Sequence, residues 1–227
     1  MRAKIKHLLY HFHMYPLFKN VKVIAWDMDT TLYKPDPVLG KAFLDGCIEE
    51  VAKKKNLSFK DAKIIFDKAR LETDSSTQTL INLKVGDFYT VWEIQKRIGK
   101  KNYLKKDPQL PLLFSHLSHL RHFLISNSVP EEIETVLGAI DLSEDYFEKC
   151  ISVVDAGEPK PSPKPFELLL KITGLPPEQH VYIGDRELVD IVPAKKLGMK
   201  TILVWGKSKI ADLSLPTVYD VAEIFRA

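Results

Sequence analysis

The sequence has few cysteines, no long apolar run and little excess charge. Its two cysteines, Cys47 and Cys150, exclude a disulfide framework and the paired spacing of a zinc site. No apolar run approaches the ~20 residues that a membrane-spanning helix needs. The formal net charge is +3, and the lysine clusters at 53–55 and 100–101 carry no interleaved aromatic residues. We interpret both clusters as solvated helix faces, and we expect neither nucleic-acid binding nor stable membrane association.

What the sequence does contain is typical of a globular protein, with 45% hydrophobic and 28% charged residues. Its length allows one large domain, or one domain with a small insertion. Residues 1–20 carry apolar side chains at helical spacing, so we expect an amphipathic helix that docks on the body or on a partner. Reduced cysteines and the lack of a signal-peptide pattern favour a cytoplasmic location. We expect a monomer or a homodimer.

Residues 36–110 are rich in charge and have the pattern of helices, without a convincing strand. Ser58, with Asp61 three residues later, fits the N-cap of one of these helices. The segment DPQLP at 107–111 carries two prolines and indicates a boundary. We therefore expect a small helical domain over residues 36–110.

From residue 111 onward, short apolar runs alternate with helical segments. This alternation predicts a parallel sheet covered by helices on both faces. The predicted strands are 21–26, 122–126, 150–154, 181–184 and 201–205. The predicted helices are 112–120, 130–137, 163–172, 190–197 and 221–225. The fold class is therefore α/β, with a doubly wound, Rossmann-like core formed by residues 21–35 and 111–227.

Polar residues follow the predicted strands at the points where the strands end. They are Asp27 and Asp29, Ser126 and Asn127, Lys160, and Asp185 and Asp190. Taken singly, each has a structural explanation as a turn residue or a helix cap. In a parallel sheet, however, all strand C-termini lie at one edge, so these groups would converge there. Several acidic residues, a hydroxyl and a lysine have no structural reason to gather, which favours a ligand site.

The residue types in this cluster indicate two bound charges. Burying several carboxylates without partners is costly, and a divalent cation would remove that cost. A set of oxygen ligands with few protein groups suits Mg²⁺. Lys160 and the Ser126 hydroxyl would then face an anion, for which a phosphoryl group has the right charge and geometry. For Lys160 we expect a position just before a helix that starts with Ser162 as N-cap and Pro163 as first residue.

Four motifs in this order resemble those of the haloacid dehalogenase (HAD) superfamily of phosphohydrolases. They are the DxDxT of Asp27, Asp29 and Thr31, the strand that ends at Ser126, the KPSP at Lys160, and the GDxxxxD of Asp185 and Asp190. The resemblance implies that residues 36–110 form a helical cap domain. It also implies a Mg²⁺-dependent phosphomonoester hydrolase that acts on a small phosphorylated metabolite through an aspartyl-phosphate intermediate.

The same resemblance implies a role for each catalytic residue. Asp27 is the nucleophile, and Asp29 protonates the leaving group and then takes a proton from the hydrolytic water. Ser126, Lys160 and the backbone amide of Asn127 bind the phosphoryl oxygens.

For the metal, the resemblance implies that Mg²⁺ lies between Asp27, the carbonyl of Asp29 and Asp185. Asp190 is a direct or a water-mediated ligand. Relatives often have glycine where Thr30 stands. The resemblance therefore does not determine the backbone conformation that follows the first strand.

The stretches WDMDTTLY and KPSPKPFE are most similar to the branch that includes pyrimidine 5′-nucleotidases, which makes a nucleoside 5′-monophosphate one candidate substrate. The alternatives are a phosphomutase of the same fold and a catalytically silent scaffold that binds a partner. A silent member would be expected to have lost Asp27, Asp29 or Asp185, and none is missing. Candidate contacts to the leaving group are Lys84, Tyr89, Trp92 and Arg97, although helical periodicity gives the aromatic residues a core role just as readily.

Overall fold

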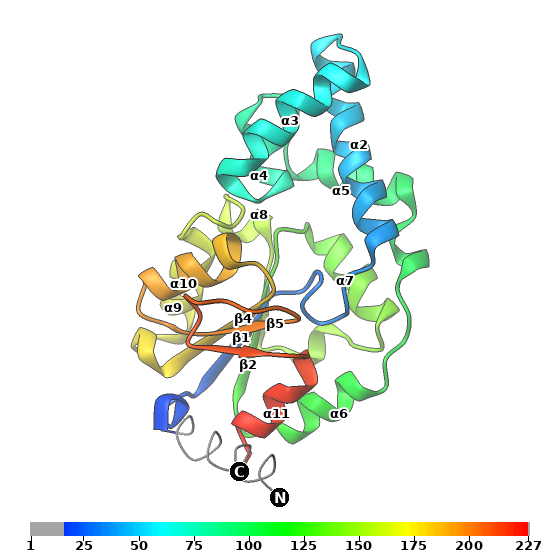
Figure 1. Cartoon of the computed structure of the whole chain (residues 1–227). Coiled ribbons are helices and arrows are strands. Elements are labelled where there is room, and N and C mark those ends of the chain that lie inside the picture. Colours follow the sequence, from blue (N-terminus) through cyan, green and yellow to red (C-terminus); the bar gives the residue numbers. More distant parts are fainter. Residues whose placement is uncertain (1–15, 227) are drawn as a thin grey trace, which may run out of the picture.

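The computed structural model describes residues 16–226, and its centre is a sheet of six parallel strands (Figure 1). The strands are β1 (Val23–Trp26), β2 (Arg121–Ile125), β3 (Lys149–Ile151), β4 (His180–Gly184), β5 (Lys200–Val204) and β6 (Leu213–Leu215). Their order is β3-β2-β1-β4-β5-β6, and every adjacent pair runs parallel. The predicted doubly wound α/β fold is confirmed.

The direction of winding changes between β1 and β4, at the middle of the sheet. Trp26 of β1 pairs with Leu124 of β2 and with Ile183 of β4, so these three strands end at the same level. In open α/β sheets, ligands bind beyond the strand C-termini at such a switch point. The register therefore brings the loops after β1, β2 and β4 together where a site is expected.

All four residues of β1 are buried because helices cover both faces of the sheet. Ile24 and Trp26 contribute to one core and Val23 and Ala25 to the other, as the two-residue period of a strand requires. The first core is covered by α6 (Gln109–His116), α7 (Pro130–Ala139) and α11 (Val221–Ile224). The second is covered by α9 (Lys164–Thr173) and α10 (Val192–Lys196).

The third strand is shorter than the predicted 150–154 and ends at Ile151. Ser152 instead caps the short helix α8 (Val153–Ala156) by accepting a hydrogen bond from the Asp155 amide. The Asp155 carboxylate in turn accepts a hydrogen bond from the Ser152 amide. This reciprocal capping box starts a helix where the apolar run alone indicated a strand.

Three predicted helices begin at other residues than expected. Pro163 is the N-cap of α9 rather than its first residue, so the N-cap predicted at Ser162 is wrong by one position. The helix predicted at 190–197 starts earlier, with a π-helical turn at Glu187–Ile191 that leads into α10. The helix predicted at 112–120 is α6, which begins at Gln109. Strand β6 has no counterpart among the predicted strands.

Between β1 and β2 the chain forms a group of helices that stands apart from the sheet (Figure 1). They are α2 (Pro37–Lys55), α3 (Phe59–Thr73), α4 (Ser76–Asn82) and α5 (Phe88–Ile98), followed by a 3-10 turn at Lys100–Tyr103. We call residues 37–103 the helical insertion. It has its own core, which includes Ile48, Phe66 and Leu80. Ser58 caps α3 as predicted, because its hydroxyl accepts a hydrogen bond from the Asp61 amide.

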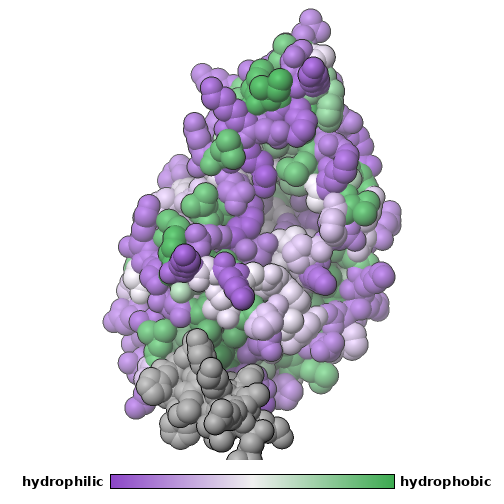
Figure 2. Space-filling model, viewed as in Figure 1, coloured by the Kyte–Doolittle hydropathy of each residue, from purple (hydrophilic) through white to green (hydrophobic). Residues whose placement is uncertain are grey.

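The amphipathic helix predicted for residues 1–20 falls mainly on residues 1–15, which lie outside the described residues. Phe18 is buried and packs edge-on against Phe225, with 5.7 Å between the ring centroids. No helix within residues 16–226 combines the length and the apolar character needed to cross a membrane. On the face drawn in Figure 2, hydrophobic residues occur in small separate groups among hydrophilic ones.

Candidate active site

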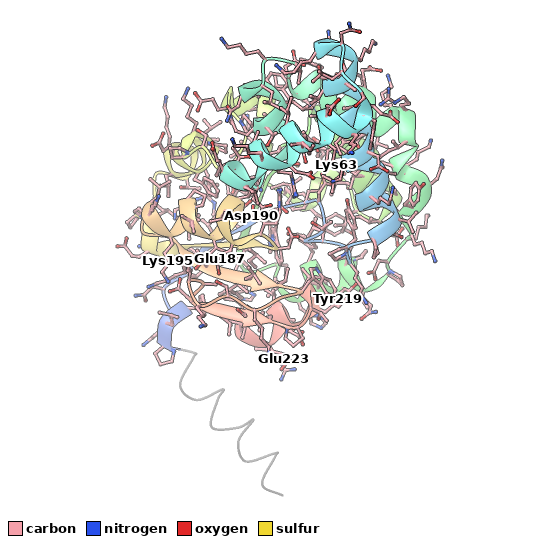
Figure 3. All side chains as sticks on the ribbon, turned by 45° about the horizontal axis from the view of Figure 1, so that its top comes forward. Lys63, Glu187, Asp190, Lys195, Tyr219 and Glu223 are labelled. Carbon is pink, nitrogen blue, oxygen red and sulfur yellow. The ribbon has the colours of Figure 1, made fainter. Side chains whose placement is uncertain are left out.

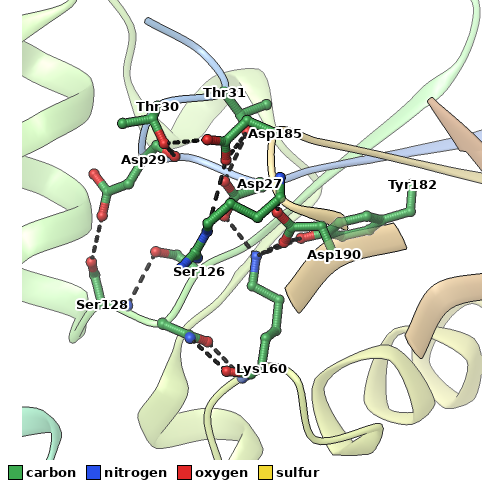
Figure 4. Close-up of polar contacts among 12 residues, drawn as sticks. Asp27, Asp29, Thr30, Thr31, Ser126, Ser128, Lys160, Tyr182, Asp185 and Asp190 are labelled. Atoms are coloured by element: carbon green, nitrogen blue, oxygen red, sulfur yellow. Dashed lines mark hydrogen bonds and ion pairs between the residues drawn. The ribbon is translucent and has the colours of Figure 1, made fainter. Parts of the chain in front are cut away.

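Asp27 and Lys160 form a buried ion pair at the C-terminal edge of the sheet (Figure 4). The Lys160 ammonium lies 2.6 Å from Asp27 Oδ1, and the Thr31 hydroxyl donates a 2.8 Å hydrogen bond to Asp27 Oδ2. Burial has the largest effect on the pKa of Asp27 and raises it. Lys160 opposes this shift and Asp190 adds to it, so the net shift is upward. The fold thus brings together two predicted site residues that are far apart in sequence.

Lys160 is fixed at both its backbone and its ammonium. The side-chain amide of Asn127 donates to the Lys160 carbonyl at 2.9 Å and accepts from the Lys160 N–H at 2.7 Å. The ammonium donates to the Tyr182 hydroxyl at 2.6 Å and to Asp190 Oδ1 at 2.8 Å. Burial lowers the pKa of Lys160, but Asp190 and Asp27 outweigh it and keep the pKa above its ordinary value. The side chain is therefore a permanent cation in a defined position.

Asp27, Asp185 and Asp190 offer carboxylate oxygens that all lie within 4.8 Å of one another. Burial, together with the charges of Asp27 and Asp190, raises the pKa of Asp185 to about 7. Carboxylates this close repel one another unless a cation lies among them, and a set of oxygen ligands suits Mg²⁺. The residues present therefore fit the metal that the sequence predicts.

Asp190 lies deeper than the other two carboxylates and is fully buried. Figure 3 shows it between the helical insertion and the sheet. Its Oδ1 accepts from the ammonium of Lys160, and its Oδ2 accepts a 3.1 Å hydrogen bond from the Arg186 amide. Because both oxygens already have donors, this geometry suits a water-mediated contact to a metal better than a direct one.

Thr30 adopts a φ of 62°, in the left-handed region where glycine is favoured. A β-branched side chain is strained in this conformation. Its hydroxyl oxygen lies 2.6 Å from the carbonyl oxygen of Asp29 and 2.7 Å from Asp185 Oδ2. The threonine therefore adopts the backbone turn of a glycine and links the loops after β1 and β4 by a contact that glycine cannot make.

Asp29 is held by two hydroxyl donors and one ion pair, which come from three segments. The Tyr33 hydroxyl and the Lys100 ammonium each lie 2.7 Å from Oδ1, and the Ser128 hydroxyl donates to Oδ2 at 3.3 Å. Burial raises the pKa of Asp29, but Lys100 and the hydrogen bonds outweigh it, so the pKa lies below its ordinary value. The side chain is 30% exposed and remains accessible to a small molecule.

Ser126 lies at the same edge of the sheet, directly after β2. Its amide donates a 3.0 Å hydrogen bond to the carbonyl of Ile151, the last residue of β3. Its hydroxyl accepts a 3.1 Å hydrogen bond from the Ser128 amide, which fixes the turn of this loop. The side chain is buried. Ser126 thus stands where the sequence predicts it, although the predicted contact with a phosphate is a proposal.

The tip of the helical insertion, between α3 and α4, contacts the core next to the site. The Arg186 guanidinium donates a 3.1 Å hydrogen bond to the carbonyl oxygen of Asp74. The Asn127 amide, besides holding Lys160, donates a 3.4 Å hydrogen bond to the Ser75 hydroxyl. The insertion therefore contacts residues adjacent to the candidate catalytic groups of the core.

Sequence reasoning missed Lys100, Tyr33, Tyr182 and Arg186. The interpretation of 100–101 as a solvated face is wrong for Lys100, whose side chain is only 6% exposed. Arg186 directly follows Asp185 in the sequence Gly-Asp-Arg, so its place beside the site could have been predicted. No local sequence pattern indicated that Lys100, Tyr33 or Tyr182 belongs to the site.

The four candidate leaving-group residues of the insertion have other surroundings. Arg97 pairs with Glu49, Trp92 packs beneath Lys96 and against Tyr89, and Lys84 is exposed. These contacts do not support the predicted role.

The parallel sheet, with a cluster of acidic residues at the C-terminal ends of its strands, is typical of α/β proteins that bind a ligand at this edge. Comparison with known proteins identifies the family. The family model described as haloacid dehalogenase-like hydrolase matches residues 23–204. Because this match covers most of the chain, the protein belongs to the haloacid dehalogenase-like hydrolase family. A HAD phosphatase from Thermococcus onnurineus has a similar fold, with a TM-score of 0.64 and 22% identity, over 90% of this chain and 97% of that one.

Two curated relatives match parts of the chain more closely in sequence. A phosphoglycolate phosphatase from Aquifex aeolicus is 32% identical over 129 residues, which cover 54% of this chain and 60% of the relative. A glyceraldehyde 3-phosphate phosphatase from Pyrococcus furiosus is 42% identical over 73 residues, which cover 32% of this chain and 30% of the relative. The matches thus span 60% and 30% of the lengths of these two proteins.

Proposed function

We propose that the protein is a Mg²⁺-dependent phosphomonoester hydrolase that uses Asp27 as its nucleophile. The observation that carries the proposal is the Asp27–Lys160 pair at 2.6 Å, with Asp185 among the neighbouring carboxylates. A carboxylate fixed beside a buried cation is suited to meet a phosphoryl group, because Lys160 can bind an equatorial oxygen as Asp27 approaches phosphorus. The Thr31 hydroxyl keeps the carboxylate in one orientation.

The reaction proceeds in two displacements at phosphorus. In the first, Asp29 starts in its protonated form, an Asp27 oxygen forms a bond to phosphorus while the bond to the leaving oxygen breaks, and Asp29 gives that oxygen its proton. In the second, water attacks phosphorus, Asp29 takes one proton from this water, and the bond to Asp27 breaks. Inorganic phosphate and the alcohol leave, and both aspartates return to their first state. Ser126, Lys160 and the backbone amide of Asn127 bind the phosphoryl oxygens throughout.

Asp27, the Asp29 carbonyl and Asp185 would hold the Mg²⁺, with Asp190 behind them. When bound, the ion screens the repulsion between the anionic nucleophile and the anionic phosphate. The chain itself supports this arrangement, because the Thr30 hydroxyl lies within 2.7 Å of both the Asp29 carbonyl and Asp185. Asp190 also fixes the ammonium of Lys160 at 2.8 Å, which keeps the phosphate-binding cation in place.

The substrate class that the comparisons favour is a small aliphatic phosphate. The relatives named above are described as phosphoglycolate and glyceraldehyde 3-phosphate phosphatases, which supports this class over a nucleoside 5′-monophosphate. We further propose that the helical insertion is a cap domain that closes on the substrate through its Asp74–Ser75 tip. A cytoplasmic location fits such a metabolite.

Two other functions remain as alternatives, and each has a distinct outcome. A phosphomutase would use the same aspartates but pass the phosphoryl group to a second hydroxyl of a sugar phosphate. A silent scaffold would release no phosphate, although the retention of Asp27, Asp29 and Asp185 argues against it. A dehalogenase is disfavoured because a departing halide needs no proton, so Asp29 would have no catalytic role.

The test is phosphate release from a panel of aliphatic phosphates, sugar phosphates and nucleoside monophosphates, with and without Mg²⁺. We expect release that depends on Mg²⁺ and is highest for the small aliphatic substrates. Asp27→Asn should abolish it. Release that survives this substitution would contradict the mechanism, and the absence of release from every substrate would favour the scaffold.

A further inference from the structure

Lys100 is a buried lysine at the point where the chain leaves the helical insertion and returns to the core. It is the first residue of the 3-10 turn Lys100–Tyr103, directly after the glycine that ends α5. Its side chain is 6% exposed, whereas its neighbour Lys101 is exposed. A buried ammonium is costly unless it is paired, so its contacts indicate what it is held there to do.

The ammonium of Lys100 lies between two acidic side chains of the core. It is 2.7 Å from Asp29 Oδ1 and 3.0 Å from Glu132 Oε1. Glu132 is buried and belongs to the first turn of α7, so it is part of a rigid element. Glu132 therefore fixes Lys100 from one side, and Lys100 fixes Asp29 from the other.

The two oxygens of Asp29 are held very differently. Oδ1 is close to both the Lys100 ammonium and the Tyr33 hydroxyl, each at 2.7 Å. Oδ2 has a single, long hydrogen bond of 3.3 Å from the Ser128 hydroxyl. Strong charge-assisted contacts on one oxygen fix the rotation of the carboxyl group and leave the other oxygen available. Oδ2 is consequently the oxygen that can exchange a proton with a substrate or with water.

We propose that Lys100 is a positioning residue for proton transfer, which holds Asp29 so that Oδ2 faces the leaving oxygen. This inference rests on the proposed function, in which Asp29 protonates the leaving group. Lys100 does not touch the phosphoryl group and acts through Asp29 alone. Its loss should therefore slow the first displacement only for leaving groups that need the proton. The second displacement, in which Asp29 takes a proton from water, is common to all substrates.

The leaving group separates this role from a merely structural one. An alkyl alkoxide is a strong base and must be protonated as it departs, whereas p-nitrophenolate is stable near neutral pH and departs without a proton. General acid catalysis contributes typically ~10²–10⁴-fold in rate where it is needed. Mispositioning Asp29 should therefore slow the first displacement strongly for an alkyl phosphate and weakly for p-nitrophenyl phosphate.

The experiment measures kcat/KM, which reports on the steps up to the first displacement, for the full chain with Mg²⁺ on 2-phosphoglycolate, or the alkyl phosphate that it hydrolyses fastest, and on p-nitrophenyl phosphate. For Lys100→Met we expect kcat/KM on the alkyl phosphate to fall roughly 10- to 100-fold. On p-nitrophenyl phosphate kcat/KM should fall less than about threefold. Lys100→Arg, which keeps the charge, should recover most of the loss.

Lys101→Met is the matched control, because this exposed neighbour should leave both substrates unaffected. Lys100→Met leaves the carboxylates of Asp29 and Glu132 without the cation between them, and their repulsion could unfold the protein. The double variant Lys100→Met/Glu132→Gln removes this repulsion and so separates loss of folding from loss of positioning. If it folds and shows the same selective loss, the positioning role holds. Equal losses of kcat/KM on both substrates, or an unchanged kcat/KM on the alkyl phosphate, would overturn the proposal. Failure of the proposed function is distinct from these outcomes, because the wild-type protein would then release no phosphate.

Discussion

The hydroxyl of Thr30 lies 2.7 Å from Asp185 Oδ2 while the backbone of Thr30 has a φ of 62°. The residue thus combines an unfavourable backbone conformation with a hydrogen bond to a partly buried carboxylate. The two effects oppose each other, so substitutions can separate them.

Replacing Thr30 by glycine removes strain of about 1–3 kcal/mol and also removes a hydrogen bond to a charged group, worth about 1.5–3 kcal/mol. We expect Thr30→Gly to change the free energy of unfolding by less than about 1 kcal/mol. Thr30→Val keeps the strain and loses the bond, so it should be less stable than Thr30→Gly by about 1–3 kcal/mol. Urea unfolding of the three proteins measures this, and a valine variant as stable as the wild type would contradict it.

Asn127 holds the backbone of Lys160 through two hydrogen bonds, of 2.7 and 2.9 Å. In Asn127→Asp the group that faces the Lys160 carbonyl is an oxygen, which repels it instead of donating to it. We expect Lys160 to lose its position, so kcat/KM should fall by ~10²-fold, as for small misplacements of catalytic groups. Inhibition by inorganic phosphate should weaken in parallel. Asn82→Asp, at an exposed position, is the control. An unchanged inhibition constant for phosphate in Asn127→Asp would show that the two hydrogen bonds to Lys160 are dispensable.

Mg²⁺ should stabilise the folded protein, because a cation relieves the repulsion among Asp27, Asp185 and Asp190. At a concentration 100 times its dissociation constant, a ligand of the native state adds about 2.7 kcal/mol to the free energy of unfolding. Thermal denaturation with and without Mg²⁺ measures the effect, with K⁺ at equal ionic strength as control. In Asp185→Asn the increase should be much smaller. An equal increase in both proteins would place the ion elsewhere.

His122 should make the protein less stable at acid pH. The Trp26 indole N–H donates to its Nδ1 at 3.1 Å, and Nε2 lies 2.9 Å from the Leu117 carbonyl, so the ring is held as the neutral form protonated on Nε2. Burial lowers the pKa of His122 below its ordinary 6.5, so the unfolded chain binds this proton more readily. The free energy of unfolding should therefore decrease as the pH falls below 6.5.

The matched variant is His122→Gln, which can accept from Trp26 and donate to Leu117 but does not titrate. Its stability should decrease less between pH 7.5 and 5.5 than that of the wild type, by denaturant unfolding at each pH. His180, whose pKa is also lowered by burial, leaves a residual slope in both proteins. Identical slopes would exclude His122 as a source of acid sensitivity.

Much of the fold was predictable because short apolar strands and helices alternate in the sequence. The strands β1, β4 and β5 are buried on both faces, so continuous apolar runs mark them clearly. The end of β3 was less clear, because the capping residues Ser152 and Asp155 compete with the apolar run around them. Strand β6 has only three residues at the edge of the sheet, too few to show a pattern.

The candidate site was predictable where residues stand directly at strand ends. Asp27, Ser126 and Asp185 follow strands whose register fixes their common level, which is a local signal combined with one topological rule. Lys100 could not be found in this way, because its burial depends on Glu132 and Asp29, which lie in distant segments. The conformation of Thr30 was also out of reach, since its sequence position indicates only that a glycine is replaced.

The central claim is that Asp27 forms a covalent bond to phosphorus. The direct measurement mixes the enzyme with a ³²P-labelled phosphomonoester and Mg²⁺, quenches in acid within one turnover, and maps the label by proteolysis and mass spectrometry. The mechanism predicts label on the peptide that contains Asp27, lost on treatment with hydroxylamine and absent in Asp27→Asn. Rapid turnover of the substrate with no label on the protein at any quench time, or with label on another residue, would contradict it.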